Sequence, residues 1–439
     1  MNKIILRIIS SGFFLSLTAS VQAQTNYDDL IAERALEIED KVIAWRRDIH
    51  EHPELSNREF RTAALVADHL RGLDIEVETE VAHTGVVGVL RGGRPGPVVA
   101  LRADMDGLPV VEQTGLPYAS TERTTYNGLD VGVMHACGHD NHVAILMGAA
   151  EVLASMREDI PGTIKFIFQP AEEGPPAGEN GGAKMMIEEG ALMDPDVEAI
   201  FGLHISQSLA AGEAGYRALG MMASAQSFEI NIRGRQTHGA RPWQGVDPVV
   251  IGSQIIMGLQ TIISRQVDST LAPAVITVGT FHGGVRYNII PDDVQLTGTI
   301  RTFDPGMRDQ IHERMHRTVN SIAEAGGASA ELIIDPGVPV TYNHVELTAQ
   351  MGPTLDRIYG GDNVVESPRV TGAEDFSFFQ EEVPGFFFYI GGRPPEVPAE
   401  EAIPNHSPLF YVDESSLLPG VKAMSTLPLD YLTQSLGQN

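Results

Sequence analysis

The segment MHACGHDNH, residues 134–142, gathers residue types that bind transition metals. It contains Cys137, the only cysteine in the chain, together with His135, His139 and His142. A lone thiol is open to oxidation, whereas a thiolate bound to a metal is protected from it. Sulfur and imidazole ligands beside a carboxylate suit zinc or a neighbouring transition metal better than calcium or magnesium. The segment therefore predicts a metal site.

Further ionisable residues follow three segments that have the composition of buried strands, PVVALR, TIKFIFQPA and EAIFGL. The residues at their carboxyl ends are Asp104 and Asp106, Glu172 and Glu173, and His204. In open parallel sheets, ligands bind beyond the carboxyl ends of the strands. Cys137 and His139 stand just before a predicted helix that follows the first of these strands. We therefore expect all of these groups to share one cleft.

This set of ligands is larger than one open metal site requires. A mononuclear catalytic zinc takes about three protein ligands and a water molecule. The candidates here are Cys137, His139, Glu173, His204 and, late in the chain, His406. Each of them alone is more often structural or inert, and only their joint position at successive strand ends favours a functional site. We expect two divalent ions that share a water molecule, with zinc, manganese, cobalt and nickel as the candidate metals.

The surrounding elements predict an α/β fold. In the first half of the chain, apolar strands alternate with helices, as in a mostly parallel sheet flanked by helices. Over 215–335 the strands alternate apolar and polar residues and are interspersed with long helices at 247–266 and 305–325, which predicts an inserted α+β domain. The α/β pattern then returns. We expect a catalytic domain in two parts, 24–214 and 336–439, interrupted by this lid or dimerisation domain.

The first 23 residues have the pattern of a secretory signal peptide. Lys3 and Arg7 accompany an apolar run, and Val21 and Ala23 are small residues placed as a cleavage site requires. No other stretch approaches the ~20 apolar residues of a membrane span. We therefore expect a periplasmic or secreted protein without a membrane anchor. The net charge of −28 disfavours nucleic acid as a partner.

The segment HERMH, residues 312–316, matches the H-E-x-x-H pattern of zincin proteases. Its helix carries one apolar stripe through Ile311 and Met315, and His312 and His316 lie beside that stripe, toward solvent. The helix also belongs to the predicted insertion, away from the strand ends that carry the other ligands. We interpret the match as a coincidence. A zincin protease is the alternative that it would support.

Eight ordered motifs make the chain similar to a known family. They are ALRADMDGLP (100–109), MHACGHDNH (134–142), FQPAEEG (168–174), the strand of His204, THGARPWQGVDP (237–248), NIIPDDVQLTGTIRTFD (288–304), TGAEDFSFF (371–379) and NHSP (405–408). The chain resembles the metal-dependent amidohydrolases of the aminoacylase/carboxypeptidase superfamily, in the branch with hippurate hydrolase, N-acyl-amino-acid amidohydrolases and plant auxin-conjugate hydrolases. The resemblance covers nearly the whole chain after the signal peptide.

This resemblance implies a binuclear centre with the five candidate ligands named above and Glu172 as the general base. It also implies that the inserted domain is a lid that dimerises and contributes His238 to the site across the dimer. Asn288 and Arg301 would hold the carbonyl and carboxylate groups of the substrate, and Asp104 would orient a ligand. The implied partners are a small N-acyl amino acid or amide substrate and a second copy of the chain, in a homodimer or larger homo-oligomer.

The chemistry expected of these groups is hydrolysis of an amide by metal-activated water. Glu172 would take the proton of the water and return it to the leaving amine, and His238 or Asn288 would stabilise the oxyanion. One departure from the wider superfamily is Arg102, which stands where relatives have a metal-binding histidine. A metallocarboxypeptidase, a dipeptidase or an amide-toxin hydrolase would carry the same motifs. A non-catalytic metal-binding protein is the alternative outside enzymes.

Overall fold

The computed structural model describes residues 27–436, so the predicted signal peptide at 1–23 lies outside the described residues. The chain forms two compact units. Unit 1 contains the residues up to Tyr216, Glu346–Glu366 and the residues from Val383 onward, and unit 2 contains Arg217–Val345 and Ser367–Glu382. Within residues 27–436, no helix combines the length and the hydropathy needed to cross a membrane.

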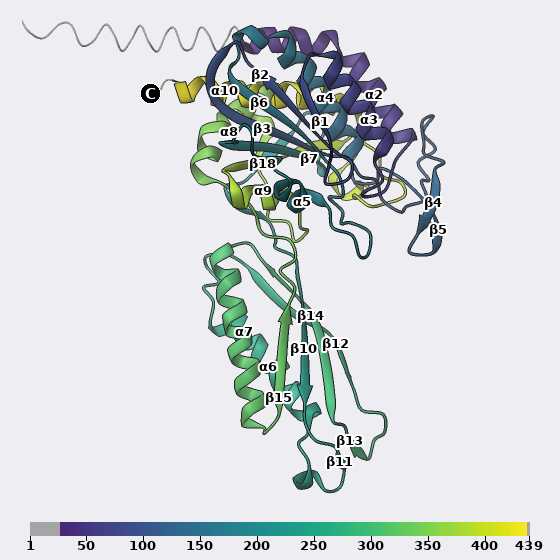
Figure 1. The fold of residues 1–439 in the computed structure, drawn as a ribbon, viewed down its shortest axis with the longest axis vertical. Helices are drawn as coiled ribbons and strands as arrows, with labels where there is room; N and C mark the ends of the chain where they lie inside the picture. The colour runs from purple at the N-terminus through teal and green to yellow at the C-terminus, as the bar shows by residue number, and fades with distance from the viewer. Residues whose placement is uncertain (1–26, 437–439) are drawn as a thin grey trace, which may run out of the picture. The chain divides into compact units, whose positions relative to one another are not determined.

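Unit 1 is built on an eight-stranded sheet with the strand order β1-β2-β6-β3-β7-β18-β8-β17 (Figure 1). The strands are β1 (Glu76–Val81), β2 (Gly85–Arg91), β3 (Arg94–Asp104), β6 (Pro161–Gln169), β7 (Ala199–Ala210), β8 (Ala214–Tyr216), β17 (Val364–Glu366) and β18 (Gly385–Arg393). The four central strands, β6, β3, β7 and β18, run parallel, and antiparallel pairs flank them. The predicted α/β fold with a mostly parallel sheet is confirmed.

Helices cover this sheet and complete the core of unit 1. They are α2 (Glu39–Glu51), α3 (Phe60–Gly72), α4 (His139–Ser155), α5 (Gly182–Glu188), α8 (Val345–Tyr359) and α10 (Leu417–Leu436). The helices α4 and α10 pack against each other and against β3, and α2 packs on α4 (Figure 1). A separate hairpin consists of β4 (Arg123–Tyr126) and β5 (Leu129–Gly132).

The strand β18 shows why the centre of the sheet is nearly all apolar. Every residue of Gly385–Arg393 is buried, because neighbouring elements cover both faces of the strand. Phe388 in its middle has no exposed surface and belongs to the main apolar core.

We expect Phe388→Ala to lower the free energy of unfolding by about 3–5 kcal/mol, because the truncation leaves a cavity in a packed core. Chemical denaturation of the metal-free protein measures this loss. Phe60→Ala is the matched control, since Phe60 is 63% exposed at the start of α3 and its loss should change stability by no more than about 0.5 kcal/mol. Equal losses in the two variants would contradict the described core.

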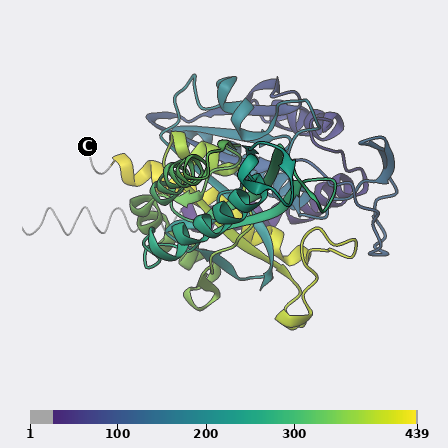
Figure 2. The same ribbon diagram turned by 90° about the horizontal axis from the view of Figure 1, so that it is seen from below.

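Unit 2 is an α+β structure with an antiparallel sheet in the order β12-β14-β10-β15. Its elements are β9 (Leu219–Met222), β10 (Gln226–Arg233), β11 (Thr237–His238), α6 (Pro248–Arg265), β12 (Ala274–Gly283), β13 (Ile289–Ile290), β14 (Asp293–Thr302), α7 (Pro305–Ala325), β15 (Ser329–Ile334), β16 (Thr341–Asn343) and α9 (Phe376–Glu382). The helices α6 and α7 lie side by side on one face of the sheet (Figures 1 and 2). Both begin with the same capping arrangement, in which an aspartate caps the first turn and a proline occupies the first position of the helix.

The observed second unit differs from the expected insertion at 215–335. It extends to Val345 and includes Ser367–Glu382, a segment that the sequence placed in the second part of the catalytic domain. The backbone of Val370 explains the difference, because it pairs with Met221 and Ala223 of unit 2. A short returning segment of this kind carries no apolar pattern that would reveal its partner strand.

Candidate metal centre

The turn before α4 presents Cys137 and His139 on the same side. Gly138 lies between them with a φ of +104°, a left-handed conformation that favours glycine. A Cβ atom at this position would also lie only 3.1 Å from the Cβ of Ile205. Cys137 is 7% exposed and His139 is fully buried. The glycine therefore allows the thiol and the imidazole on either side of it to face one point.

His204 reaches the same point from the middle of β7. Its Nδ1 donates a hydrogen bond to the carbonyl oxygen of Ile205 at 2.7 Å. Its Nε2 lies 3.4 Å from the Sγ of Cys137. Because the proton is held on Nδ1, Nε2 carries the lone pair that a metal would use.

Glu173 and His406 complete the group, although they are far apart in the sequence. The Nε2 of His406 lies 2.9 Å from the Oε1 of Glu173. The backbone of His406 has a φ of +68°, and its N–H donates to the carbonyl oxygen of Ala136 at 2.7 Å. The neighbouring Asn405 donates from Nδ2 to the carbonyl oxygen of Cys137 at 2.9 Å. These two anchors hold the loop of His406 against the turn before α4.

The potential ligand atoms form overlapping groups within unit 1. In each group these atoms lie within 4.8 Å of one another. The groups are Cys137, His139 and His204; Cys137, Glu173 and His406; His139, Glu172 and Glu173; and Asp104, His139 and His142. The structure thus brings all five predicted ligands together, with Cys137 shared by the first two groups.

The electrostatics of the group suit a bound cation. Burial alone would raise the pKa of the Cys137 thiol, but electrostatic attraction to His204, followed by the nearby imidazoles of His139 and His406, outweighs it and holds that pKa well below its usual range. Burial alone would lower the pKa of His139, but nearby acidic groups, led by Asp104, hold it well above its usual range. A bound divalent cation would take the place of the protons that stabilise the Cys137 thiolate and the nearby carboxylates.

Arg102 occupies its own ion pair and does not approach the ligand atoms as a histidine would. Its Nη1 donates to the Oδ2 of Asp104 at 2.6 Å, and its Nε donates to the Oε1 of Gln169 at 2.8 Å. The other oxygen of Asp104 accepts from the Nδ1 of His142 at 2.6 Å, while His142 Nε2 accepts from the N–H of Ile205 at 2.9 Å. Burial lowers the pKa of His142 to about 4, with Asp104 opposing it, so the ring is neutral at pH 7.

The two aspartates after β3 approach His139 at different distances. The Oδ1 of Asp104, which we expected to orient a ligand, lies 3.8 Å from the Nδ1 of His139. The Oδ1 of Asp106 is closer, at 3.2 Å. We expected Asp106 in the same cleft but assigned it no specific role, although its position two residues after Asp104 places both on the same side of an extended chain.

Glu172 belongs to the group with His139 and Glu173 but lies outside the two groups that share Cys137. Its side chain is 9% exposed, and its Oε2 lies 3.9 Å from the Nε2 of His139. Glu173, the next residue, has its side chain 17% exposed and faces His406. Adjacent carboxylates in this loop can therefore serve two purposes, one as a ligand and the other as a proton acceptor.

Comparison with known proteins identifies the family. The model of the family described as Peptidase family M20/M25/M40 matches residues 100–430. The chain belongs to this family. The expected resemblance to metal-dependent amidohydrolases is confirmed.

Several M20 relatives match the chain over most of their length. It is 43% identical to the thermostable carboxypeptidase 1 of Saccharolobus solfataricus, over 90% of this chain and 96% of that protein. It is 35% identical to the N-acetyl-L-cysteine deacetylase of Bacillus subtilis, over 93% of this chain and 94% of that protein. The crystal structure of the Bacillus subtilis YXEP protein, a dinuclear metal-binding peptidase of the M20 family, is 34% identical, covers 90% of this chain and 99% of that chain, and has a TM-score of 0.73. The chain is therefore a metal-dependent hydrolase of amide or peptide bonds.

The remaining predicted site residues lie in unit 2 of this M20 enzyme. His238 in β11 is exposed, and its Nδ1 accepts from the N–H of Ala240 at 3.0 Å. Asn288 lies beside it, because its carbonyl oxygen accepts from the N–H of Gly239 at 2.8 Å. Arg301 lies near the other end of β14, where it pairs with Val275 of β12.

The distance along β14 separates these residues within unit 2. Asn288 precedes the amino end of the strand, and Arg301 is its next-to-last residue. At ~3.4 Å per residue, the eight steps from Asp293 to Arg301 span roughly 27 Å. His238 and Asn288 therefore form one group, and Arg301 lies apart from them.

The HERMH histidines are not arranged as a zincin site. The Nε2 of His312 lies 3.1 Å from the Oε1 of Gln226 and is engaged with it. Within residues 27–436, neither His312 nor His316 belongs to a group of three potential metal ligands. Ile311 and Met315 are fully buried, as the apolar stripe of α7 predicted.

We expect His312→Ala to leave the bound metal and kcat/KM within about twofold of wild type, because this side chain is placed outside the metal centre. Elemental analysis and an amidase assay of the same preparation check this. Loss of metal in His312→Ala would instead favour a zincin protease.

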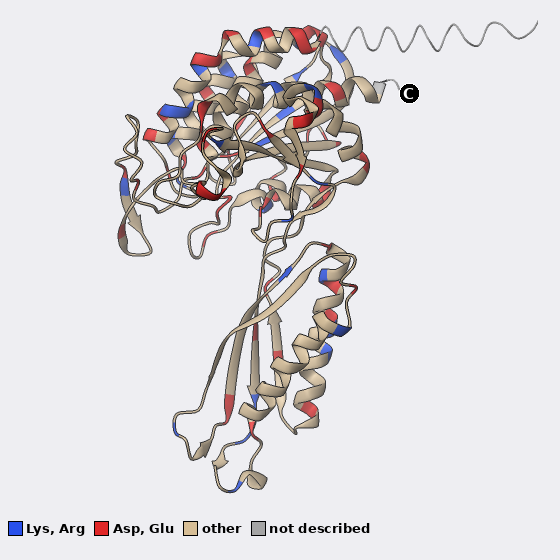
Figure 3. Cartoon of the chain, turned by 180° about the vertical axis from the view of Figure 1, so that it is seen from behind, with Lys and Arg blue, Asp and Glu red and all other residues tan. Residues whose placement is uncertain are grey.

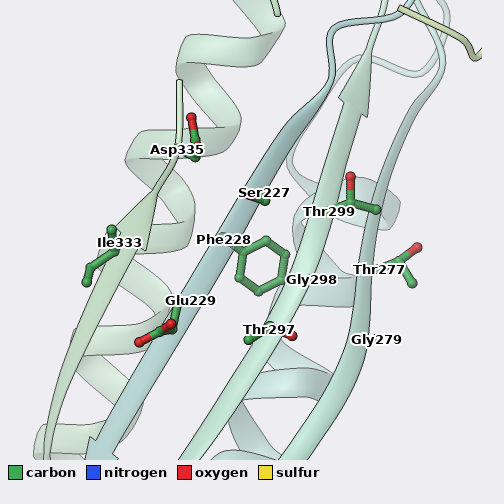
Figure 4. A pocket seen from close by; sticks show the side chains of 10 residues that line it. All are labelled: Ser227, Phe228, Glu229, Thr277, Gly279, Thr297, Gly298, Thr299, Ile333 and Asp335. Carbon is green, nitrogen blue, oxygen red and sulfur yellow. The ribbon is translucent and has the colours of Figure 1, made fainter. Parts of the chain in front are cut away.

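Two broader surface features do not offer a competing site. One hollow of unit 2, about 540 Å³, lies on the sheet, and Figure 4 shows its lining of threonine, glycine and Phe228 with the carboxylates of Glu229 and Asp335. No imidazole or thiol lines it.

Acidic residues outnumber basic ones by 58 to 30, and both kinds are interspersed along the helices of unit 1 (Figure 3). Such a distribution is that of a solvated surface.

Proposed function

We propose that this M20 enzyme is an exported amidohydrolase that holds two divalent transition-metal ions and cleaves the amide bond of N-acyl amino acids or related small amides. The observation that carries the proposal is the pair of ligand groups that share Cys137, with Glu172 beside them. Zinc, manganese, cobalt and nickel all suit this mixture of thiolate, imidazole and carboxylate.

The residues present fit such a centre. Both ring nitrogens of His139 are buried and make no hydrogen bond of suitable geometry with the described residues, and such groups are rare unless a ligand satisfies them. Cys137 would be shared, with His139 and His204 on one side and Glu173 and His406 on the other. Bound ions would supply Lewis-acid activation of a water molecule and of the scissile carbonyl.

The side chains of this chain would perform the proton transfers and bind the substrate. Glu172 would take a proton from the attacking water and deliver it to the leaving amine. His238 and Asn288 would donate hydrogen bonds to the oxyanion. Arg301 would pair with the carboxylate of the amino acid.

The separation of these groups in unit 2 supports a homodimer. Asn288 precedes β14 and Arg301 lies near its far end. The strand alone spans roughly 27 Å from Asp293 to Arg301, which is farther than a small substrate extends. We propose that one copy of unit 2 supplies Arg301 to a centre and that the partner's copy supplies His238 and Asn288. Mixing His238→Ala chains with Arg301→Ala chains should then restore activity at one of the two sites of a mixed dimer.

A panel of substrates tests the proposed class. We expect hydrolysis of N-acetyl and N-benzoyl amino acids, abolished by chelation and restored by added metal. The relative named a carboxypeptidase is the most similar of the three described, so dipeptides and longer peptides belong in the same panel. A preference for peptides with a free amino terminus by more than tenfold in kcat/KM would support the peptidase function and overturn ours.

Export rests on the signal-peptide pattern of the first 23 residues. Amino-terminal sequencing of the native protein should find a start near Gln24. A mature chain that retains Met1 would contradict export without affecting the proposed chemistry.

A further inference from the structure

The loop that carries Glu172 and Glu173 has an unusual backbone. It follows the end of β6 at Gln169, and Ala171 has a φ of +53°, a conformation that few residues other than glycine adopt. Such a conformation persists only where its surroundings impose it. The positions of both glutamates therefore depend on what holds this loop.

Asp106 holds the loop through consecutive backbone groups. The N–H of Glu172 donates to its Oδ1 at 3.1 Å, and the N–H of Glu173 donates to its Oδ2 at 3.1 Å. The hydroxyl of Ser56 donates to Oδ2 at 2.7 Å. Asp106 is only 1% exposed, so water does not compete for these bonds.

The same carboxylate also contacts the other half of the metal centre. Its Oδ1 lies 3.2 Å from the Nδ1 of His139, at the start of α4. One buried side chain thus touches the ligand from α4 and the backbone of both loop glutamates. Asp104, which engages Arg102 and His142, has no contact of this kind with the loop among its described bonds.

Glu59 supports the loop one residue earlier. Its Oε1 accepts from the N–H of Ala171 at 2.9 Å, and its Oε2 accepts from the hydroxyl of Thr84 at 2.5 Å. Burial, followed by the charge of Asp106, raises the pKa of Glu59 to about 8.

We infer that Asp106 is a positioning residue that fixes the base Glu172 and the ligands Glu173 and His139 in one arrangement. This inference rests on the proposed function, because it assigns the aspartate a role in that same centre. Asp106 acts through its neighbours: it sets the direction of two side chains through their N–H groups and holds the Nδ1 side of His139, so that Nε2 faces the cluster.

Asp106→Asn tests this role with little change in shape. One oxygen becomes an NH₂ group, which cannot accept from the loop, and the negative charge beside His139 is lost. We expect the dissociation constant for Zn²⁺ to rise about 10–100-fold and kcat at saturating metal to fall about 10–100-fold, with KM changed by less than about threefold. Competition with a chelator of known affinity measures the first quantity independently of activity.

Glu54→Gln is the matched control. The Glu54 carboxylate also accepts from consecutive backbone N–H groups, those of Arg61 and Thr62, both at 2.9 Å, but these lie at the start of α3. We expect this variant to lose stability without a change in Zn²⁺ affinity or kcat. If Asp106→Asn, like Glu54→Gln, loses stability but keeps its Zn²⁺ affinity and kcat, Asp106 only stabilises the fold and the inference is wrong.

A second variant covers the case in which Asp106→Asn does not fold. Ser56→Ala removes one hydrogen bond to Asp106, and we expect a smaller change of the same kind, about threefold or more in both Zn²⁺ affinity and kcat. Unchanged values in folded Ser56→Ala, with Asp106→Asn unfolded, would also overturn the inference. Failure of the wild-type protein to bind Zn²⁺ would count against the proposed function instead.

Discussion

Glu172→Gln should lower kcat by about 10²–10⁴-fold, the range that a general acid–base contributes. The amide keeps the size of the side chain but cannot accept the proton of the attacking water or return it to the amine. Glu172 lies outside the two groups that share Cys137, so we expect the metal content to remain that of wild type. Steady-state kinetics and elemental analysis of the same sample measure both quantities.

Glu188→Gln is the control for this substitution. Glu188 is exposed at the end of α5, and its replacement should leave kcat within about twofold of wild type. A Glu172→Gln enzyme that keeps more than a tenth of its activity would show that another group is the base. Simultaneous loss of metal would show that Glu172 is itself a ligand.

Cys137→Ser should lower kcat/KM by roughly a hundredfold or more, because the thiolate is shared by both ligand groups and a serine hydroxyl is not deprotonated at neutral pH. An excess of Zn²⁺ or Mn²⁺ should not restore the activity. The substitution is nearly isosteric, so the metal-free variant should unfold within a few degrees of metal-free wild type.

The comparison of unfolding temperatures separates a lost ligand from a damaged fold. With metal present, wild type should gain stability over its chelated form, since a ligand that binds only the folded state stabilises it. Cys137→Ser should show a smaller gain or none. Equal stabilisation of both proteins by metal would contradict the assignment of Cys137 as a shared ligand.

The sequence was sufficient to place most of the centre because a parallel sheet directs the ends of its strands to one edge. The strands β3, β6 and β7 proved to be parallel neighbours. Asp104 ends β3, Glu172 and Glu173 follow β6, and His204 lies in the middle of β7, just beyond the residues that pair with β3. Their convergence could therefore be predicted once these segments were interpreted as parallel strands. The long amphipathic helix at 305–325 was likewise predictable from its apolar stripe.

Other features depend on contacts that have no local pattern. The loop of His406 is held by a left-handed residue and by Asn405, and neither signals a partner hundreds of residues away. The closer approach of Asp106 than of Asp104 to His139 depends on how the chain leaves β3. The hairpin at Arg123–Gly132 was not predicted, because its short strands are mostly exposed.

The ligand groups and the substrate-selecting residues belong to different parts of the chain. The ligand groups and Glu172 lie within unit 1, so their chemistry can be derived from named atoms and distances. The acyl group and the amine are selected by the shape of the complete substrate cleft, to which His238, Asn288 and Arg301 of unit 2 are proposed to contribute. The substrate panel therefore addresses a separate question from the metal centre.

Elemental analysis of the purified mature protein tests the central claim most directly, with wild type, Cys137→Ser and His312→Ala measured together. We predict about two equivalents of transition metal per chain in wild type and in His312→Ala, and a clear loss in Cys137→Ser. Metal that persists in Cys137→Ser but disappears in His312→Ala would contradict the proposed centre.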